Sequence, residues 1–151
     1  MNIATIREAL QTVVLAGVVA SNNTANVYAY PPESPELPAV MILPAPFENG
    51  QYVNYWGSFG RHLYAVGLRL ELRIAGTEVD AARTLDDYLS TAMPAIIDAI
   101  KANPTLSGAC ETVLLRSSAV PGRFASSEME TARTWLASSV SIEVHARKEA
   151  Q

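Results

Sequence analysis

The chain has 151 residues, of which 49% are hydrophobic and 17% charged, and this predicts one ordered domain with a substantial core. Its 11 Lys and Arg residues against 15 Asp and Glu residues give a net charge of −4, and since no segment concentrates basic residues, nucleic acid is a poor candidate for a tightly bound partner. A single cysteine, Cys110, excludes an internal disulfide and a multi-thiolate zinc site.

The first predicted element is a helix that Asn2 can cap. We expect this helix to end near Gly17. The apolar run at residues 13–20 is too short to span a bilayer and is not preceded by a basic segment, so we expect a soluble, unexported protein with no membrane partner. The apolar residues of the helix follow the three-and-four spacing of one helical face: Ile3, Ile6, Leu10, Val13 and Val14.

Two short strands are predicted next, at residues 26–30 and 39–43. Between them lies a proline-rich connector, residues 31–38, with four prolines beside Glu33, Ser34 and Glu36. Proline fixes its own φ and cannot donate a hydrogen bond to a sheet, so we expect the connector to be stiff and exposed.

Residues 47–60, the aromatic segment, hold five aromatic side chains among glycines and the turn-forming pair Asn49-Gly50. One interpretation is that these rings pack onto the core of their own domain. The other is that some of them stay exposed until a neighbouring subunit covers them, since aromatic residues are enriched in the cores of interfaces. The candidate interface residues are Phe47, Tyr52, Tyr55, Trp56 and Phe59.

A long strand follows from residue 61. Its even positions from Tyr64 to Ile74 are apolar, whereas its odd positions include Arg69, Glu71 and Arg73. This period of two predicts one buried face and one face exposed to water. We expect the three charged residues to be available to a partner.

The strand leads directly into a second helix. Thr77 and Asp80 form a plausible capping box, so we expect the helix to begin at Glu78. Pro94 either kinks the helix or restarts it, and Asn103-Pro104 ends it. The predicted apolar stripe contains Val79, Ala82, Leu85, Leu89, Met93, Ile96, Ile97 and Ile100.

Two further strands are predicted at residues 109–116 and 134–146, and they could pair as neighbours. The connection between them, residues 117–133, is longer than a hairpin needs, so we expect a mobile loop or an extended arm there. It contains Arg123 and Phe124, which we add to the candidate interface residues. Residues 147–151 should form a frayed tail.

These elements predict an α+β fold. Residues 1–146 should form a single two-layer domain with a mixed or antiparallel sheet, and helices should pack on one face of it.

Groups suited to catalysis are few. His62 and His145 lack the neighbours of a metal site, and adjacent Asp86 and Asp87 point about 100° apart on a helix. Cys110 begins an apolar strand, where a free cysteine usually behaves as a small buried hydrophobe. We therefore expect no catalytic residues, no cofactor and no metal, and no enzymatic activity.

The order of elements resembles that of the tail terminator proteins of long-tailed bacteriophages. The likeness covers residues 2–146. It includes the predicted strand at residues 26–30, the proline-rich connector, the aromatic segment, and the long strand that leads into Thr77-Glu78-Val79-Asp80. The resemblance implies a virion structural protein that forms a ring, usually a hexamer. Such a ring would cap the tail tube protein, join the head-tail connector protein and at most let DNA pass through its lumen. It would assemble in the host cytoplasm and remain in the virion.

Three alternatives stay open. Two belong to the same assembly: a head-completion or neck protein, and the tail-tube subunit itself. The third belongs to another class, a small α+β ligand-binding or catalytic domain with a pocket between the sheet and the long helix.

Overall fold

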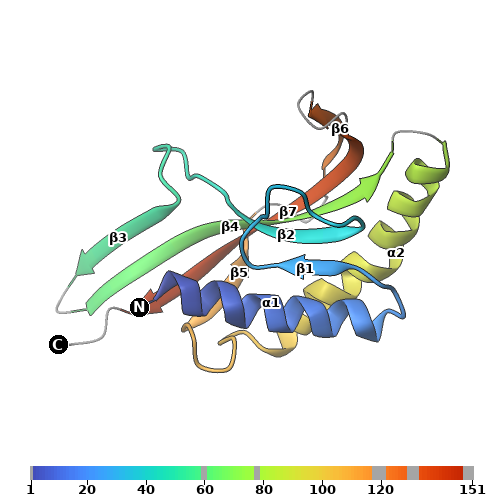
Figure 1. The fold of residues 1–151 in the computed structure, drawn as a ribbon. Helices are drawn as coiled ribbons and strands as arrows, with labels where there is room; N and C mark the ends of the chain where they lie inside the picture. The colour runs from blue at the N-terminus through green and yellow to red at the C-terminus, as the bar shows by residue number, and fades with distance from the viewer. Residues whose placement is uncertain (1, 59–60, 77–78, 117–121, 129–132, 148–151) are drawn as a thin grey trace.

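The computed structural model describes residues 2–58, 61–76, 79–116, 122–128 and 133–147, and shows a two-layer α+β domain (Figure 1). One sheet forms the first layer, and two helices on one of its faces form the second. The predicted fold class is confirmed. At residues 56–58, 61–63, 122–128, 133–134 and 147 only the backbone is described.

The sheet is built around two antiparallel strands of 15 residues each, β4 and β7, paired from Leu63–Arg147 to Ala75–Trp135. β2 and β3 pair one after the other with the outer edge of β4, and β5 and β6 do the same with β7. β1 pairs parallel to β2, which makes the sheet mixed. The strands are β1 (Asn26–Tyr28), β2 (Ala39–Pro44), β3 (Val53–Ser58), β4 (Arg61–Ala75), β5 (Thr112–Leu115), β6 (Gly122–Glu128) and β7 (Arg133–Arg147).

Helix α1 (Ile3–Ala20) begins as predicted, because the side chain of Asn2 accepts hydrogen bonds from the backbone N–H groups of Ala4 and Thr5. The expected end at Gly17 is wrong, since the helix continues for three more residues. Gly17 instead lies where α1 crosses α2. A Cβ added there would be 2.7 Å from the Cα of Ile96, so the glycine allows the two helix backbones to approach closely.

Helix α2 (Val79–Ala102) continues through Pro94 without a break. Of the predicted capping box, Asp80 lies in the first turn of the helix, whereas Thr77 and the expected first residue, Glu78, lie outside the described residues. Val79 is wrongly placed in the apolar stripe, because it is 68% exposed in the first turn of the helix. The rest of the predicted stripe is buried or half-buried, led by Leu85, Met93, Ile96 and Ile100.

The core lies between the helices and the sheet. The even positions of β4 and their neighbours on β7 point toward the helices and are buried, as their period of two predicts. Among the described residues, α1 is the one helix with the length and mean hydropathy, 1.5, of a membrane span. Many core helices share these properties. In this structure the buried stripe of α1, which includes Ile6, Leu10 and Val14, packs into the core.

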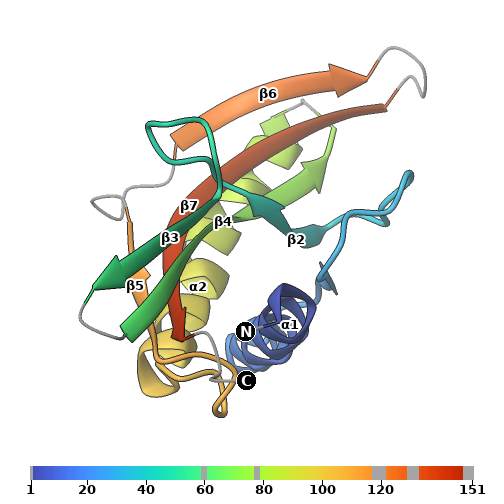
Figure 2. The ribbon, with the colours of Figure 1, turned by 90° about the vertical axis from the view of Figure 1, so that its left-hand side faces the viewer.

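The sheet is longer than the helices that cover it. A 15-residue strand extends about 50 Å, whereas helices of 18 and 24 residues extend about 27 and 36 Å. Two hairpins therefore project from the covered body at opposite ends of the β4–β7 pair (Figures 1 and 2). We name them the β3–β4 arm, which reaches past the N-terminal end of α1, and the β6–β7 arm.

The β6–β7 arm decides between the two expectations for residues 117–133. Residues 122–128 form strand β6, paired with β7 from Gly122–Ser139 to Glu128–Arg133. This part of the connection is an extended arm, whereas residues 117–121 and 129–132 lie outside the described residues.

Candidate interaction surface

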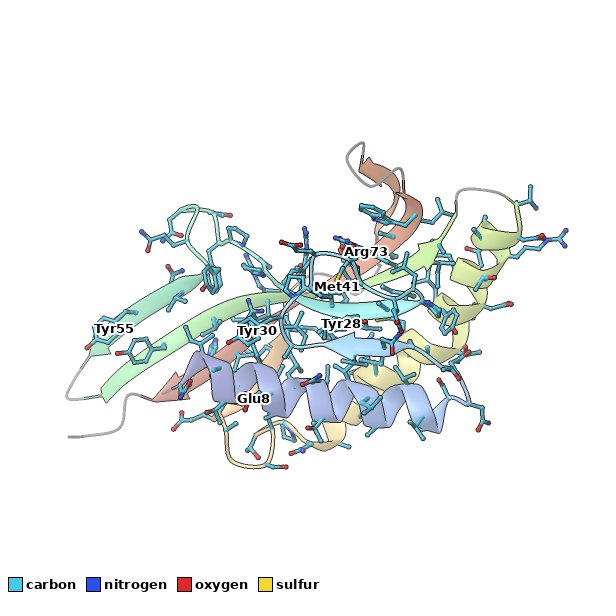
Figure 3. The ribbon with its side chains drawn as sticks, viewed as in Figure 1. Glu8, Tyr28, Tyr30, Met41, Tyr55 and Arg73 are labelled. Carbon is cyan, nitrogen blue, oxygen red and sulfur yellow. The ribbon has the colours of Figure 1, made fainter. Side chains whose placement is uncertain are left out.

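The candidate surface is the open face of the sheet, which is the face opposite the helices. The register of β4 and β7 sets its layout, because directly paired residues point to the same side of a sheet. Arg69 lies beside Ser141, Glu71 beside Ser139, and Arg73 beside Ala137. Figure 3 shows Arg73 and Met41 on this side of the ribbon, away from α1.

Glu71 joins two arginines on the open face. Its Oε2 atom lies 2.6 Å from Nε of Arg73, and its Oε1 atom lies 3.7 Å from an Nη atom of Arg69. The guanidinium of Arg73 also stacks over the buried ring of Trp135, 4.6 Å from the ring centre. The expected exposure of Glu71 is wrong, because only 2% of the residue is accessible. Glu71 therefore orients the two arginines and does not itself reach the solvent.

Arg116, which was not predicted as an interface residue, connects two segments on the open face. It follows β5, and its Nη1 and Nη2 atoms donate hydrogen bonds to the carbonyl oxygens of Ala45 and Pro46, at 2.5 and 2.8 Å. The same guanidinium stacks over the ring of Phe47, 4.2 Å from its centre. Arg116 thus ties the chain after β5 to the loop after β2, across the middle of the sheet.

Gly67 of β4 lies beneath this contact. A Cβ added to it would be 2.2 Å from the oxygen of Ala45 and 2.6 Å from Nη1 of Arg116. Real side chains do not tolerate such distances, so glycine is required where the loop and the guanidinium cross the strand.

A hollow of about 410 Å³ opens beside this contact, lined by Ala45, Pro46, Arg69, Arg116, Ser139 and Ser141. We name it the arginine cup. Two guanidinium groups and two hydroxyl groups face the cup. Both kinds of group donate hydrogen bonds and are suited to binding an anionic oxygen such as that of a carboxylate. Among the described residues, the buried Nε atom of Arg69 has no hydrogen-bond partner.

The aromatic segment divides into two groups. Phe47, beneath Arg116, and Tyr52, half-buried against the core, belong to their own domain. Tyr55, on the β3–β4 arm, is 49% exposed, and its ring centre lies 5.0 Å from that of Tyr64. Trp56 pairs with Leu63 in the backbone, but its side chain, like the whole of Phe59, lies outside the described part.

Arg123 and Phe124 lie on β6, at the opposite end of the sheet from Tyr55. Their backbones pair with Ser138 and Ala137 of β7, and their side chains are outside the described part. The structure therefore does not bring the ten predicted interface residues into one patch. The described ones are distributed over the two arms, the open face and the segment between β2 and β3.

The described residues contain no group of three or more His, Cys, Asp or Glu side chains that could hold a metal. His145 contacts Glu143 on the open face, with Nε2 and Oε1 2.6 Å apart. Burial raises the pKa of the Cys110 thiol to about 11, and the nearby Glu111 carboxylate acts in the same direction. The thiol is therefore protonated at neutral pH and unsuited to nucleophilic attack.

Together these features define a two-layer α+β domain with one helix-covered face, one open polar face and two projecting arms. No protein-family model matches the chain, and a comparison with curated proteins found no match.

Proposed function

We propose that this protein is a ring-forming structural protein of a bacteriophage tail, acting as a tail terminator. In this role it caps the end of the tail tube and docks to the head-tail connector, through surface complementarity and without enzymatic activity. The proposal combines the resemblance in element order with the shape of the domain.

The observation that carries the proposal is the pair of arms at opposite ends of the β4–β7 pair (Figure 2). The β3–β4 arm and the β6–β7 arm differ in sequence and in strand pairing. Two unlike surfaces at opposite ends of a subunit favour head-to-tail contacts, which close into a ring when the rotation between subunits divides a full turn. A two-fold dimer would instead need one self-complementary patch.

The charge distribution is compatible with this role. A net charge of −4 would not make the lumen of a ring hold DNA tightly, so DNA could pass through it. The partners under this proposal are copies of the chain itself, the tail tube protein and the head-tail connector protein, in the host cytoplasm during assembly and in the virion afterwards.

The test is the mass of the purified protein in solution, together with electron microscopy of the concentrated sample. A terminator should give closed rings of one size, most simply hexamers. Open-ended tubes would instead identify a tail-tube subunit, and rings found only at the head side of purified particles would identify a neck protein. A strict monomer that stays monomeric beside tail tubes would contradict the proposal and favour a ligand-binding or catalytic domain.

Tyr55 provides a variant for the same test. Because its ring is half exposed on the β3–β4 arm, Tyr55→Ser should reduce ring formation while changing the free energy of unfolding by less than about 1 kcal/mol. Val79→Ser is the matched control, since Val79 is exposed at the start of α2. Loss of folding in the isolated Tyr55→Ser protomer would show that this ring belongs to the core.

A further inference from the structure

The open face carries an excess of positive charge although the chain as a whole is acidic. Of the six Lys and Arg side chains that the structure describes, three lie on this face: Arg69, Arg73 and Arg116. The acidic residues of β4 and β7 are Glu71 and Glu143. Among the described side chains of β4, β7 and residue 116, three cations therefore stand against two carboxylates, in a chain that carries −4 overall. Glu48, in the exposed loop after β2, is the further carboxylate near Arg116.

The two carboxylates do not neutralise the arginine cup. Glu71 makes its short contact, 2.6 Å, with Arg73 and only a 3.7 Å contact with Arg69. Glu143 contacts His145. Arg116 donates hydrogen bonds to two carbonyl oxygens, which carry no net charge. The guanidinium groups of Arg69 and Arg116 therefore keep most of their charge available for an anion in the cup.

The connector, residues 31–38, carries the complementary charge. It contains Glu33 and Glu36, both exposed, and no basic residue. Its backbone is held at Glu36, whose N–H donates to the hydroxyl of Tyr28 and whose carbonyl accepts from the side-chain amide of Asn26, at 3.2 and 3.1 Å. With four prolines as well, the connector presents its carboxylates from a stiff segment, so little conformational entropy is lost when they bind.

The connector and the cup lie at different places in the sheet. The connector joins β1 to β2 at one edge, whereas the cup lies over β4 and β7 and is also lined by Arg116 and by the loop after β2. Figure 2 shows the connector projecting from the β2 side of the domain, away from β5. This arrangement suits a contact between two copies, in which the edge of one subunit meets the open face of the next.

We propose that the arginine cup is the receptor for the acidic connector of a neighbouring copy, with Glu36 or Glu33 of that copy binding between Arg69 and Arg116. The hydroxyl groups of Ser139 and Ser141 supply further donors to the carboxylate. This inference rests on the proposed ring and names one contact between its subunits besides the two arms.

The first experiment is a charge exchange, read out as the association constant from sedimentation of the full chain. Arg69→Glu should weaken association about tenfold or more, and so should the double variant Glu33→Lys/Glu36→Lys. Combining all three changes should bring association partly back, above that of either parent variant, because the new lysines meet the carboxylate introduced at position 69 while Arg116 still opposes them. Arg69→Gln repeats the test without placing a new carboxylate beside Glu71.

The controls make the same charge changes on the exposed surface of α2, with Arg83→Glu and Asp98→Lys, and should leave association unchanged. Thermal unfolding confirms that each variant is folded. Rings that persist in Arg69→Glu, or association that the combined variant does not raise above that of either parent variant, would overturn the cup as the connector's receptor and leave the ring proposal standing. A monomeric unchanged chain would overturn both.

The second experiment detects the contact without relying on stability. Ser141→Cys and Ser34→Cys, the second of which keeps both connector carboxylates, are prepared separately, mixed, and treated at neutral pH with a short thiol cross-linker. A cross-linked pair containing one chain of each kind is the expected product, and Cys110 should react little because it is buried. Ser141→Cys mixed with Asp98→Cys is the control. Equal yields in the two mixtures would contradict the proposed contact.

Discussion

The helix-covered face and the open face of one sheet both contain fully buried side chains, but different forces hold them. On the covered face, burial comes from many apolar side chains such as Leu70 and Ile142, packed under α1 and α2. On the open face, where the apolar Met41 is also fully buried, a few directional contacts add to the packing, among them Glu71 with Arg73 and Arg116 with two carbonyl oxygens. The comparison shows that directional contacts between charged and polar groups can order a face that has no helices over it.

The largest expected effect is on the covered face. Leu70 is 0% exposed in the middle of β4, so Leu70→Ala leaves a cavity and should lower the free energy of unfolding by about 3 kcal/mol, measured by urea denaturation. Leu114→Ala is the control, because Leu114 is 47% exposed and should cost less than about 1 kcal/mol. Similar losses in the two variants would contradict the assignment of the core.

The contact of Arg116 with the loop after β2 should give the next largest effect. Gly67→Ala places a methyl group against the Ala45 oxygen and Arg116, so the loop must move, at a cost of about 2 kcal/mol. If the cost arises because Arg116 is displaced, the double variant Gly67→Ala/Arg116→Ala should lose less than the sum of the two single losses. Additive losses would show that the two residues act independently.

The ion contacts of the open face should contribute slightly less to the free energy of unfolding than the Arg116 contact does. Glu71→Gln removes the charge that holds Arg73 and Arg69 while keeping the shape of the side chain, and should cost about 1.5 kcal/mol. Glu48→Gln, in an exposed loop, should cost less than about 0.5 kcal/mol. An unchanged urea midpoint in Glu71→Gln would mean that apolar packing alone orders the open face.

The last effect is again on the covered face and develops only at alkaline pH. The pKa of Cys110 in the folded chain is about 11, above the 9.0 of an unperturbed thiol, so the unfolded chain loses its thiol proton first as pH rises. The contribution of Cys110 to stability is therefore complete below pH 9 and decreases between pH 9 and about 11. Urea denaturation of the unchanged chain and of Cys110→Ala across this range measures it, and the variant should show the shallower decrease.

The sequence predicted the covered face well because its signal is local. The period of two in β4 identified the buried residues from Leu68 to Ile74, and Asn2 was correctly assigned as the cap of α1. The expected end of α1 at Gly17 was wrong, since glycine is tolerated within a helix when a neighbouring backbone needs the space. Val79 was wrongly assigned to the core. The apolar spacing of the sequence includes the first turn of α2, but Val79 in that turn is exposed.

The open face was predicted less completely. The charged residues were placed on the correct side of β4, but the burial of Glu71 and the cup beside Arg69 were not foreseen. Arg116 gave one signal in the sequence, a lone arginine directly after an apolar strand. Its partners are 70 and 71 residues away, so no local pattern could identify them.

The sequence by itself determined which side of each strand and helix is apolar, because the backbone repeat of a strand or helix fixes where every side chain points. It also determined that the chain is acidic and that it has few groups suited to catalysis. The tertiary structure decided which charges meet, which aromatic rings stay exposed, and where the cup forms. These depend on strand register and on how far each strand extends beyond the helices, and both are set only when segments distant in sequence pack together.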